Sequence, residues 1–288
     1  YMNNLKSYLF ETDAIKVCKG DKPFWYTSGK IGPYFINTHF VYGSEEDAAS
    51  LLSFIDENKH DKLAMPQKLF PLIKAQYENN KIYNAVINEM LTFIKENINV
   101  DEIDYISGGE RRDWFFSNII ANILEKPHIT IFKDLDTIVS DYNFENSSLV
   151  KSINGKKVLH ITDLITIASS FIRAWIPAIQ NLGGELVWSL CVVDRMQGGS
   201  DRLSDLGIKS YSLTQIDESL FVTAFEKGII DKAQLDMVHN FIKDPDGSMR
   251  NFLITHPDFL ENALNSDEKT AGRAKLCIDG DLYNLKEN

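Results

Sequence analysis

The spacing of apolar and polar positions changes near residue 100. Residues 45–58 and 67–97 place apolar side chains three or four positions apart, as at Leu69, Leu72 and Ile73, which is typical of helices that bury one face. From residue 103 onwards short apolar runs alternate with helical stretches, and this pattern predicts strands and helices in turn. The order favours an α/β fold in which helices flank a parallel sheet.

The individual elements follow from the same pattern. Strands are predicted over 103–106, 129–132, from Val158 onwards, 186–193 and 209–213, with a helix over 113–125. Residues 134–157 form a long polar connection, a length typical of functional lids or of disordered segments. Residues 5–18 predict one or two helices, residues 218–288 are mostly helical in pattern, and Asp244-Pro245-Asp246-Gly247 predicts a turn.

One segment predicts an anion-binding site. An apolar strand begins at Val158 and ends at Asp163, a turn containing Thr166, Ser169 and Ser170 follows, and a helix then runs to Gly183-Gly184. Backbone N–H groups of such a turn, together with the helix N-terminus, attract phosphate. The acid at the strand end can hold sugar hydroxyls or a metal. The alternative is that these hydroxyl residues and Asp163 only cap the turn and the helix.

Composition and charge narrow the classes of partner. Of the 288 residues 44% are hydrophobic and 11% aromatic, which is ample for a buried core. The formal net charge of −11 argues against nucleic acid, because phosphate-backbone binding needs a basic surface. No apolar run approaches the ~20 residues that span a bilayer, so no membrane partner is expected. Three cysteines far apart in the chain suit a reducing cytoplasm.

Three segments, in order, resemble a known family. The 158–170 run resembles the phosphoribosyl-diphosphate (PRPP) binding motif of type I phosphoribosyltransferases, and Val193-Asp194-Arg195-Met196-Gln197-Gly198-Gly199 resembles the corresponding strand end of orotate phosphoribosyltransferases. Thr27-Ser28-Gly29-Lys30-Ile31-Gly32-Pro33-Tyr34-Phe35-Ile36-Asn37 resembles the family's N-terminal motif. The resemblance covers roughly residues 8 to 220.

The resemblance implies a type I phosphoribosyltransferase-like parallel sheet flanked by helices, with helical N-terminal and C-terminal additions. Residues 1–220 would form this domain, with a hood segment at 1–45 and a helical region at 45–100, and 221–288 would be a helical C-terminal extension. The implied activity transfers the phosphoribosyl group from PRPP to orotate, giving orotidine 5′-monophosphate and diphosphate. Mg²⁺ as cofactor and a cytoplasmic homodimer are implied in the same way.

The resemblance also implies roles for particular residues. The PRPP site would comprise Thr162, Asp163, Thr166, Ala168, Ser169, Ser170, Arg111 and Arg112, with Asp163, Arg111 and Lys133 as the catalytic residues. Two guanidinium groups after Gly108-Gly109 suit bidentate phosphate contact, although a solvated surface pair is the alternative. Lys30, Tyr34, Phe35 and Arg195 would bind the base, with Tyr34 and Phe35 equally able to serve as core residues. No metal is expected to be ligated directly, and Asp163 would reach Mg²⁺ through water.

Four departures from the family pattern leave other functions open. Thr162 stands where the family has the first of two adjacent acids, Ala168 replaces a glycine, and Ile31 occupies the position of a base-binding lysine. The 134–154 segment, where the family has a lid with a lysine and a histidine, contains only Lys151 as a cation and no histidine. The chain could therefore be a catalytically reduced protein that binds nucleotide or PRPP in a regulatory role, or a phosphoribosyltransferase for another nucleobase.

Overall fold

The computed structural model describes residues 4–286 of the chain. Contacts divide these residues into two compact units. The first unit comprises residues 4–14 and Thr38–Ile216, and the second comprises Ile15–Asn37 together with the residues from Asp217 onwards. The chain therefore passes from one unit to the other three times.

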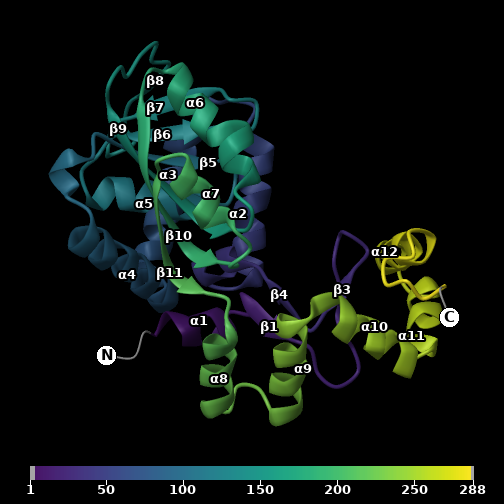
Figure 1. The fold of residues 1–288 in the computed structure, drawn as a ribbon. Helices are drawn as coiled ribbons and strands as arrows, with labels where there is room; N and C mark the ends of the chain where they lie inside the picture. Colours follow the sequence, from purple (N-terminus) through teal and green to yellow (C-terminus); the bar gives the residue numbers. More distant parts are fainter. Residues whose placement is uncertain (1–3, 287–288) are drawn as a thin grey trace. The chain divides into compact units, whose positions relative to one another are not determined.

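A seven-stranded sheet forms the centre of the first unit (Figure 1). Its strand order is β11-β10-β9-β5-β6-β7-β8, and the five strands from β11 to β6 run parallel. The strands are β5 (Tyr105–Gly109), β6 (His128–Ile131), β7 (Thr137–Ser140), β8 (Ser147–Ser148), β9 (Lys157–Ile165), β10 (Glu185–Asp194) and β11 (Lys209–Gln215). The α/β fold with a mostly parallel sheet, predicted from the alternation of apolar runs, is confirmed.

Helices cover both faces of this sheet because its crossovers run in opposite directions from β5. The connection through α5 (Trp114–Ile123) leads to β6 on one side of β5. The connections through η3 (Phe171–Trp175) with α6 (Ile176–Asn181), and through α7 (Gly199–Asp205), lead from β9 to β10 and β11 on the other side. Right-handed crossovers in opposite directions place their helices on opposite faces.

Two adjacent glycines at the end of β5 allow this close packing. A Cβ on Gly108 would lie 2.1 Å from Ser117 Oγ of α5, and a Cβ on Gly109 would lie 2.2 Å from Cζ2 of Trp175 in η3. Successive residues of a strand point to opposite faces. The Gly-Gly pair is therefore needed for packing against both helical layers, in addition to any role beside a phosphate.

Four helices and two 3₁₀ turns precede the sheet in the first unit. They are α1 (Leu5–Glu11), η1 (Thr38–Tyr42), α2 (Glu45–Asn58), α3 (Met65–Asn79), α4 (Lys81–Asn97) and η2 (Val100–Glu102). The helical stretch predicted over 67–97 is two helices, because Asn80 has an extended backbone and its side chain accepts a hydrogen bond from the Tyr83 N–H as the N-cap of α4.

The prediction of one long polar connection over 134–157 is wrong. The chain turns after β6 and adds β7 and β8 to the sheet edge in antiparallel fashion. The sequence pattern did not indicate these strands. β8 has only two residues, and in β7 the alternation between half-buried and buried residues does not coincide with an alternation between polar and apolar side chains. This segment then returns along the sheet, and the Ile153 N–H donates to the Leu182 carbonyl just before the amino end of β10.

The second unit contains short strands and the C-terminal helices. Antiparallel pairs form between β1 (Ile15–Val17) and β4 (Tyr34–Ile36), and between β2 (Phe24–Trp25) and β3 (Ile31–Gly32). The helices are α8 (Glu218–Glu226), α9 (Lys232–Lys243), α10 (Pro245–Thr255), α11 (Asp258–Leu264) and α12 (Glu268–Asp279). Met249, Phe252, Leu253, Cys277 and Tyr283 pack with Ile31 in a core of this unit.

Two predictions for these segments are wrong and one stays a prediction. Residues 15–17 form a strand rather than a helix, with the buried–exposed–buried alternation of a half-buried strand. Asp244 caps α10 instead of starting a turn, and its side chain accepts from the Gly247 N–H. The division into 1–220 and 221–288 stays a prediction; its outer ends lie beyond the described residues, and the contacts group 15–37 with the C-terminal helices.

Candidate functional site

A polar cavity of about 360 Å³ opens at the carboxyl ends of β5 and β9 in the first unit. From β5 the chain proceeds to β6 on one side and later to β9 on the other, so this is a topological switch point, where open α/β sheets bind ligands. Eleven residues of the two loops and the β6 end face it: Glu110, Arg111, Arg112, Asp113, Lys133, Thr162, Asp163, Thr166, Ala168, Ser169 and Ser170. All eight residues expected at the PRPP site, and Lys133, lie here.

The turn between β9 and the following helix forms one wall of the cavity. Ala168 has a left-handed backbone (φ 58°), and a helix begins at Ser169 and continues through η3 and α6. The first N–H groups of a helix have no partner within it, so those of this helix are available to an anion. The Gly199 N–H donates to the Thr166 carbonyl at 3.0 Å, which fixes the turn from the neighbouring loop.

Cationic side chains come from the opposite wall. Arg111 forms an ion pair with Asp56 of α2 (2.5 Å), whereas Arg112 and Lys133 have no side-chain hydrogen bond or ion pair to any residue between 4 and 286. Burial, followed by the charges of Arg112 and Arg111, lowers the pKa of His39 to about 3. The loop is held by Glu110, which accepts from Lys59 Nζ (2.9 Å) and the Lys133 N–H (3.1 Å).

Asp163 contributes a buried carboxylate to the cavity. Asp163 is only 7% exposed, and its Oδ2 has no hydrogen-bond partner among the described residues. Burial and then the charge of Asp113 raise the pKa of Asp163 to about 7, while Arg112 opposes this shift. A buried oxygen without a partner, on a residue that lines a polar cavity, is an acceptor that still lacks a hydrogen bond.

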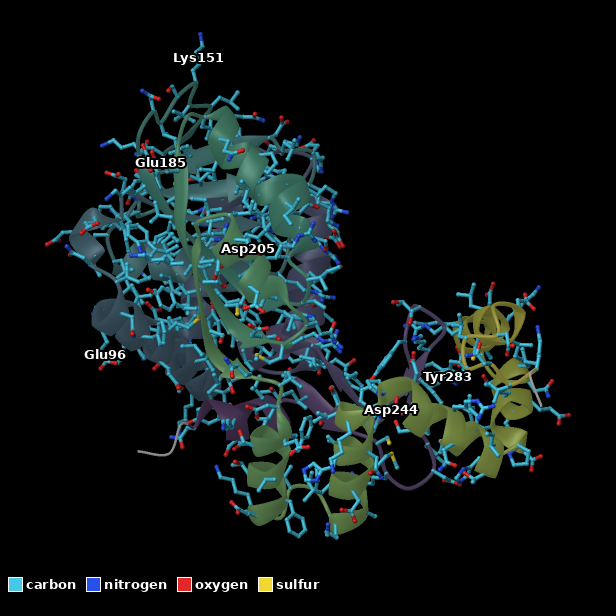
Figure 2. The ribbon with its side chains drawn as sticks, viewed as in Figure 1. Glu96, Lys151, Glu185, Asp205, Asp244 and Tyr283 are labelled. Atoms are coloured by element: carbon cyan, nitrogen blue, oxygen red, sulfur yellow. The ribbon has the colours of Figure 1, made fainter. Side chains whose placement is uncertain are left out.

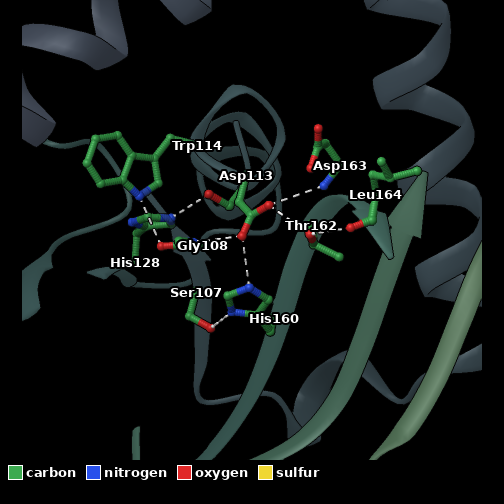
Figure 3. Close-up of polar contacts among 11 residues, drawn as sticks. Ser107, Gly108, Asp113, Trp114, His128, His160, Thr162, Asp163 and Leu164 are labelled. Carbon is green, nitrogen blue, oxygen red and sulfur yellow. Dashed lines mark hydrogen bonds and ion pairs between the residues drawn. The ribbon is translucent and has the colours of Figure 1, made fainter. Parts of the chain in front are cut away.

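Asp113 is a site residue that the sequence analysis did not identify. Figure 3 shows its carboxylate among the strand ends, where Oδ1 accepts from Thr162 Oγ1 (2.7 Å) and from the Asp163 N–H (3.3 Å). Oδ2 accepts from the Gly109 N–H (3.0 Å) and lies 3.1 Å from His160 Nε2. An acid directly before an apolar helix signals an N-cap, yet this side chain makes no cap hydrogen bond and turns to β9 instead.

None of the four residues expected to bind the base lines the cavity. Arg195 follows β10 in the first unit, in a turn where Asp194 accepts from the Met196 N–H and Ser200 Oγ, but it does not line the cavity. Lys30, Tyr34 and Phe35 belong to the second unit. There Lys30 pairs with Asp246, Tyr34 is buried against Phe221 and Phe241, and Phe35 contacts Phe24 edge to face.

The only cation of the 134–154 segment, Lys151, lies away from the cavity. Lys151 comes two residues before Ile153, whose N–H donates to Leu182 at the amino edge of the sheet. Figure 2 shows Lys151 at the same end of the sheet as Glu185, the first residue of β10. The cavity is at the carboxyl edge, so Lys151 cannot replace the family's lid cations in this arrangement.

The donor set permits Mg²⁺ only with help from a ligand. Within residues 4–286 no group of three or more histidine, cysteine or acidic side chains is arranged to hold a metal ion. Asp163 has a buried oxygen without a partner at the cavity, which fits a water-mediated contact to an ion already bound to phosphate oxygens.

No helix in the described part of the chain has the length and apolarity needed to cross a membrane.

Comparisons with known proteins give a consistent result. No protein-family model matches the chain. The orotate phosphoribosyltransferase of Saccharolobus solfataricus is 39% identical over 75 residues, 26% of this chain and 38% of that protein. Those of Sulfurisphaera tokodaii and Rhodopseudomonas palustris are each 29% identical, over 49% and 47% of this chain and 67% and 74% of their own lengths. The match therefore spans well under half of the first relative.

Solved structures show the same fold. The orotate phosphoribosyltransferase of Francisella tularensis superposes with a TM-score of 0.53 at 15% identity, over 82% of this chain and 96% of that one. The Aeropyrum pernix enzyme gives 0.50 at 16% identity, over 79% and 99%. These superpositions show that the chain has the type I phosphoribosyltransferase fold, and the sequence matches show that it is similar, at low identity, to orotate phosphoribosyltransferases.

Proposed function

We propose that this protein is a phosphoribosyltransferase that uses PRPP, with orotate as the acceptor base. The observation that most supports this is that one cavity at the β5–β9 switch point is lined by the end of β9, the turn after it, and Arg111, Arg112 and Lys133. Its volume of about 360 Å³ is within the range of small-molecule sites. The similarity to orotate phosphoribosyltransferases supports the choice of base.

Each part of PRPP has a proposed set of contacts in the cavity. The 5′-phosphate would bind the N–H groups that begin the helix at Ser169, with the hydroxyls of Thr166, Ser169 and Ser170 as further donors. Asp163 would accept hydrogen bonds from the ribose hydroxyls. Diphosphate would lie against Arg112, Lys133 and Arg111, with Arg111 leaving Asp56 to reach it.

The proposed reaction breaks the bond between ribose C1 and the diphosphate oxygen, which keeps the electron pair. A bond forms between C1 and a ring nitrogen of orotate, and the proton of that nitrogen passes to solvent or to the released diphosphate. Because the leaving group takes up negative charge, the cationic wall stabilises the transition state electrostatically. Mg²⁺ would neutralise part of the diphosphate charge when bound, with Asp163 as its water-mediated contact.

The test is an assay with PRPP, orotate and Mg²⁺ that follows the absorbance of orotate, with calorimetry of PRPP binding on the same protein. We expect turnover, and we expect Asp163→Asn to abolish PRPP binding or turnover. Arg195→Ala should weaken orotate more than PRPP. PRPP binding without any turnover on orotate, uracil or purine bases would contradict the enzymatic proposal.

A regulatory binding protein is the second candidate. It is favoured by the placement of Lys151 at the far edge of the sheet and by the Arg111–Asp56 ion pair, which together leave fewer cations for diphosphate. Tight binding of nucleoside monophosphates without turnover would support this candidate. A homodimer, expected from the resemblance, is a further proposal that light scattering in solution tests.

A further inference from the structure

The carboxylate of Asp113 connects the ends of two neighbouring strands at the cavity. Asp113 is 5% exposed, and its two carboxylate oxygens accept from the N–H of Gly109, the last residue of β5, and from the Thr162 hydroxyl and the Asp163 N–H of β9. Asp113 reaches them from the residue that precedes α5. The side chain of Asp113, from the loop that also carries Arg111 and Arg112, thus joins the end of β5 to β9, the strand that carries Asp163 (Figure 3).

Buried groups behind Asp113 fix its orientation. His160, fully buried in β9, lies with Nε2 3.1 Å from Asp113 Oδ2 and Nδ1 2.8 Å from Ser107 Oγ. The imidazole also stacks on Trp175, with ring centroids 6.0 Å apart and planes at 22°. The His160 side chain is held by Asp113, Ser107 and Trp175 and therefore has little rotamer freedom. A fixed neighbour of this kind is what keeps a residue of a ligand-binding site in one orientation.

All protein donors around Asp113 point at the same carboxylate, so its own oxygens are not free for a ligand. Asp163 differs, because it lines the cavity and its buried Oδ2 has no hydrogen-bond partner among the described residues. Asp113 therefore acts on the ligand through Asp163. It accepts a hydrogen bond from the backbone N–H of Asp163, and its negative charge repels the Asp163 carboxylate. It is a positioning residue rather than a residue that touches substrate.

We propose that Asp113 is the positioning residue of the ribose subsite, and that Thr162 and Asp113 are a matched pair in which the residue before α5 provides the carboxylate and β9 provides its hydrogen-bond donor. The inference rests on the proposed function, since the ribose subsite belongs to it. The pairing explains why position 162 holds a hydroxyl side chain. A second acid there would place two carboxylates at the 2.7 Å contact that the hydroxyl now bridges.

The first experiment is a double-mutant cycle on stability, without any ligand. Urea unfolding is measured for the wild type, Thr162→Asp, Asp113→Asn and the double variant. We expect Thr162→Asp alone to weaken the folding equilibrium by about a hundredfold or more, as for an uncompensated buried charge. In the Asp113→Asn background, Thr162→Asp should weaken the folding equilibrium by less than about tenfold, because the introduced asparagine amide can donate to the new carboxylate.

The outcomes of this cycle are decisive in either direction. A double variant that folds better than Thr162→Asp alone supports the pairing, including the case in which Thr162→Asp alone does not fold. Additive losses of stability overturn it, and so does a double variant that fails to fold while Asp113→Asn folds.

The second experiment separates positioning from structure by comparing ribose 5-phosphate with inorganic phosphate in calorimetry. Asp113→Asn should weaken ribose 5-phosphate by about tenfold or more, the loss expected for one charge-assisted hydrogen bond. Inorganic phosphate, which needs only the 166–170 turn, should bind as in the wild type. Equal losses for both probes, or no loss for either, overturn the positioning role.

A matched control exists on β6, which is separated from β9 by β5 in the sheet. His128 in β6 is also fully buried and pairs with a serine, Ser117, but it does not contact Asp113. We expect His160→Leu to weaken ribose 5-phosphate selectively, His160→Gln to restore part of the affinity through its amide donor, and His128→Leu to change stability alone. Failure of PRPP turnover would contradict the proposed function, while the cycle and the two probes would still test the role of Asp113.

Discussion

Asp163 combines burial with a neighbouring negative charge, and both act on the same carboxyl group. These causes raise its pKa from 3.8 to about 7. A carboxyl whose folded-state pKa is raised stabilises the fold fully at pH values below its unfolded pKa, and this contribution is lost as the pH rises through the folded pKa. We therefore expect the free energy of unfolding, measured without divalent cations, to fall between about pH 4 and pH 7 through this group.

Asp163→Asn provides the comparison, because the amide cannot ionise. The wild type should lose stability relative to Asp163→Asn as the pH rises across this window, measured by urea unfolding at each pH. The charged groups facing Asp163 are Asp113 and Arg112. Because the positive charge of Arg112 favours the ionised form of Asp163, Arg112→Ala should make the loss of stability across this pH window larger than in the wild type. A stability difference that stays constant across the window would show that Asp163 is not the titrating group.

The two arginines of the β5 loop differ in their partners at the residue scale. Arg112 has no ion pair among residues 4–286, whereas Arg111 is held by Asp56. We expect Arg112→Ala to weaken PRPP by about 1.5 to 3 kcal/mol, the range for a hydrogen bond to a charged group, as measured by calorimetry. Lys156→Ala is the charge-matched control. It removes a partly exposed ion pair between Asp104 and Lys156, the residue before β9, and should leave PRPP affinity unchanged.

At the scale of elements, the sheet and its two helical layers meet most closely at the Gly108-Gly109 pair. A Cβ on Gly109 would lie 2.2 Å from the Trp175 ring, so Gly109→Ala must displace the indole or the strand end. We expect a loss of about 1 to 3 kcal/mol in the free energy of unfolding, the usual cost of overpacking. Gly272→Ala, where no atom lies within 4 Å of the added Cβ, should cause no loss.

The elements that the sequence predicted well are those whose burial is continuous along the strand. β9 and β10 read as apolar runs because both faces are covered by helices, and the motif after β9 could be located from them. β7, β8 and β1 could not be found in this way, since two to four residues at a sheet edge or in a hairpin carry too short a pattern. Their assignment depends on a partner strand elsewhere in the chain.

The candidate site was predictable to the same extent. Arg111, Arg112, Lys133 and the 162–170 turn were placed by motif and order, and the structure brings them to one cavity. Asp113 was missed because its side chain leaves the helix that it begins and bonds to β9, a choice set by tertiary contacts with His160 and Thr162. Local sequence around Asp113 signals only a helix start.

At the scale of the whole molecule, three of the four residues expected to hold the base, Lys30, Tyr34 and Phe35, belong to a different compact unit from the residues expected to hold phosphate. Lys30 is engaged with Asp246 in the second unit, with side chains 40% and 62% exposed. An exposed ion pair of this kind contributes at most about 1 kcal/mol to stability, so Lys30→Ala should fold normally. Its effect on ligands is then a direct test of whether the second unit takes part in recognition of the base.

We expect Lys30→Ala to leave the affinity for ribose 5-phosphate unchanged, because every residue that lines the phosphate cavity belongs to the first unit. If Lys30 binds orotate as the resemblance implies, the KM for orotate should rise while the KM for PRPP stays constant, as measured by initial rates at saturating co-substrate. Asp246→Ala, which breaks the same ion pair but leaves the lysine, should not raise the KM for orotate. An equal effect of the two variants would assign Lys30 to the stability of the second unit and leave Arg195, in the first unit, as the remaining candidate for the orotate carboxylate.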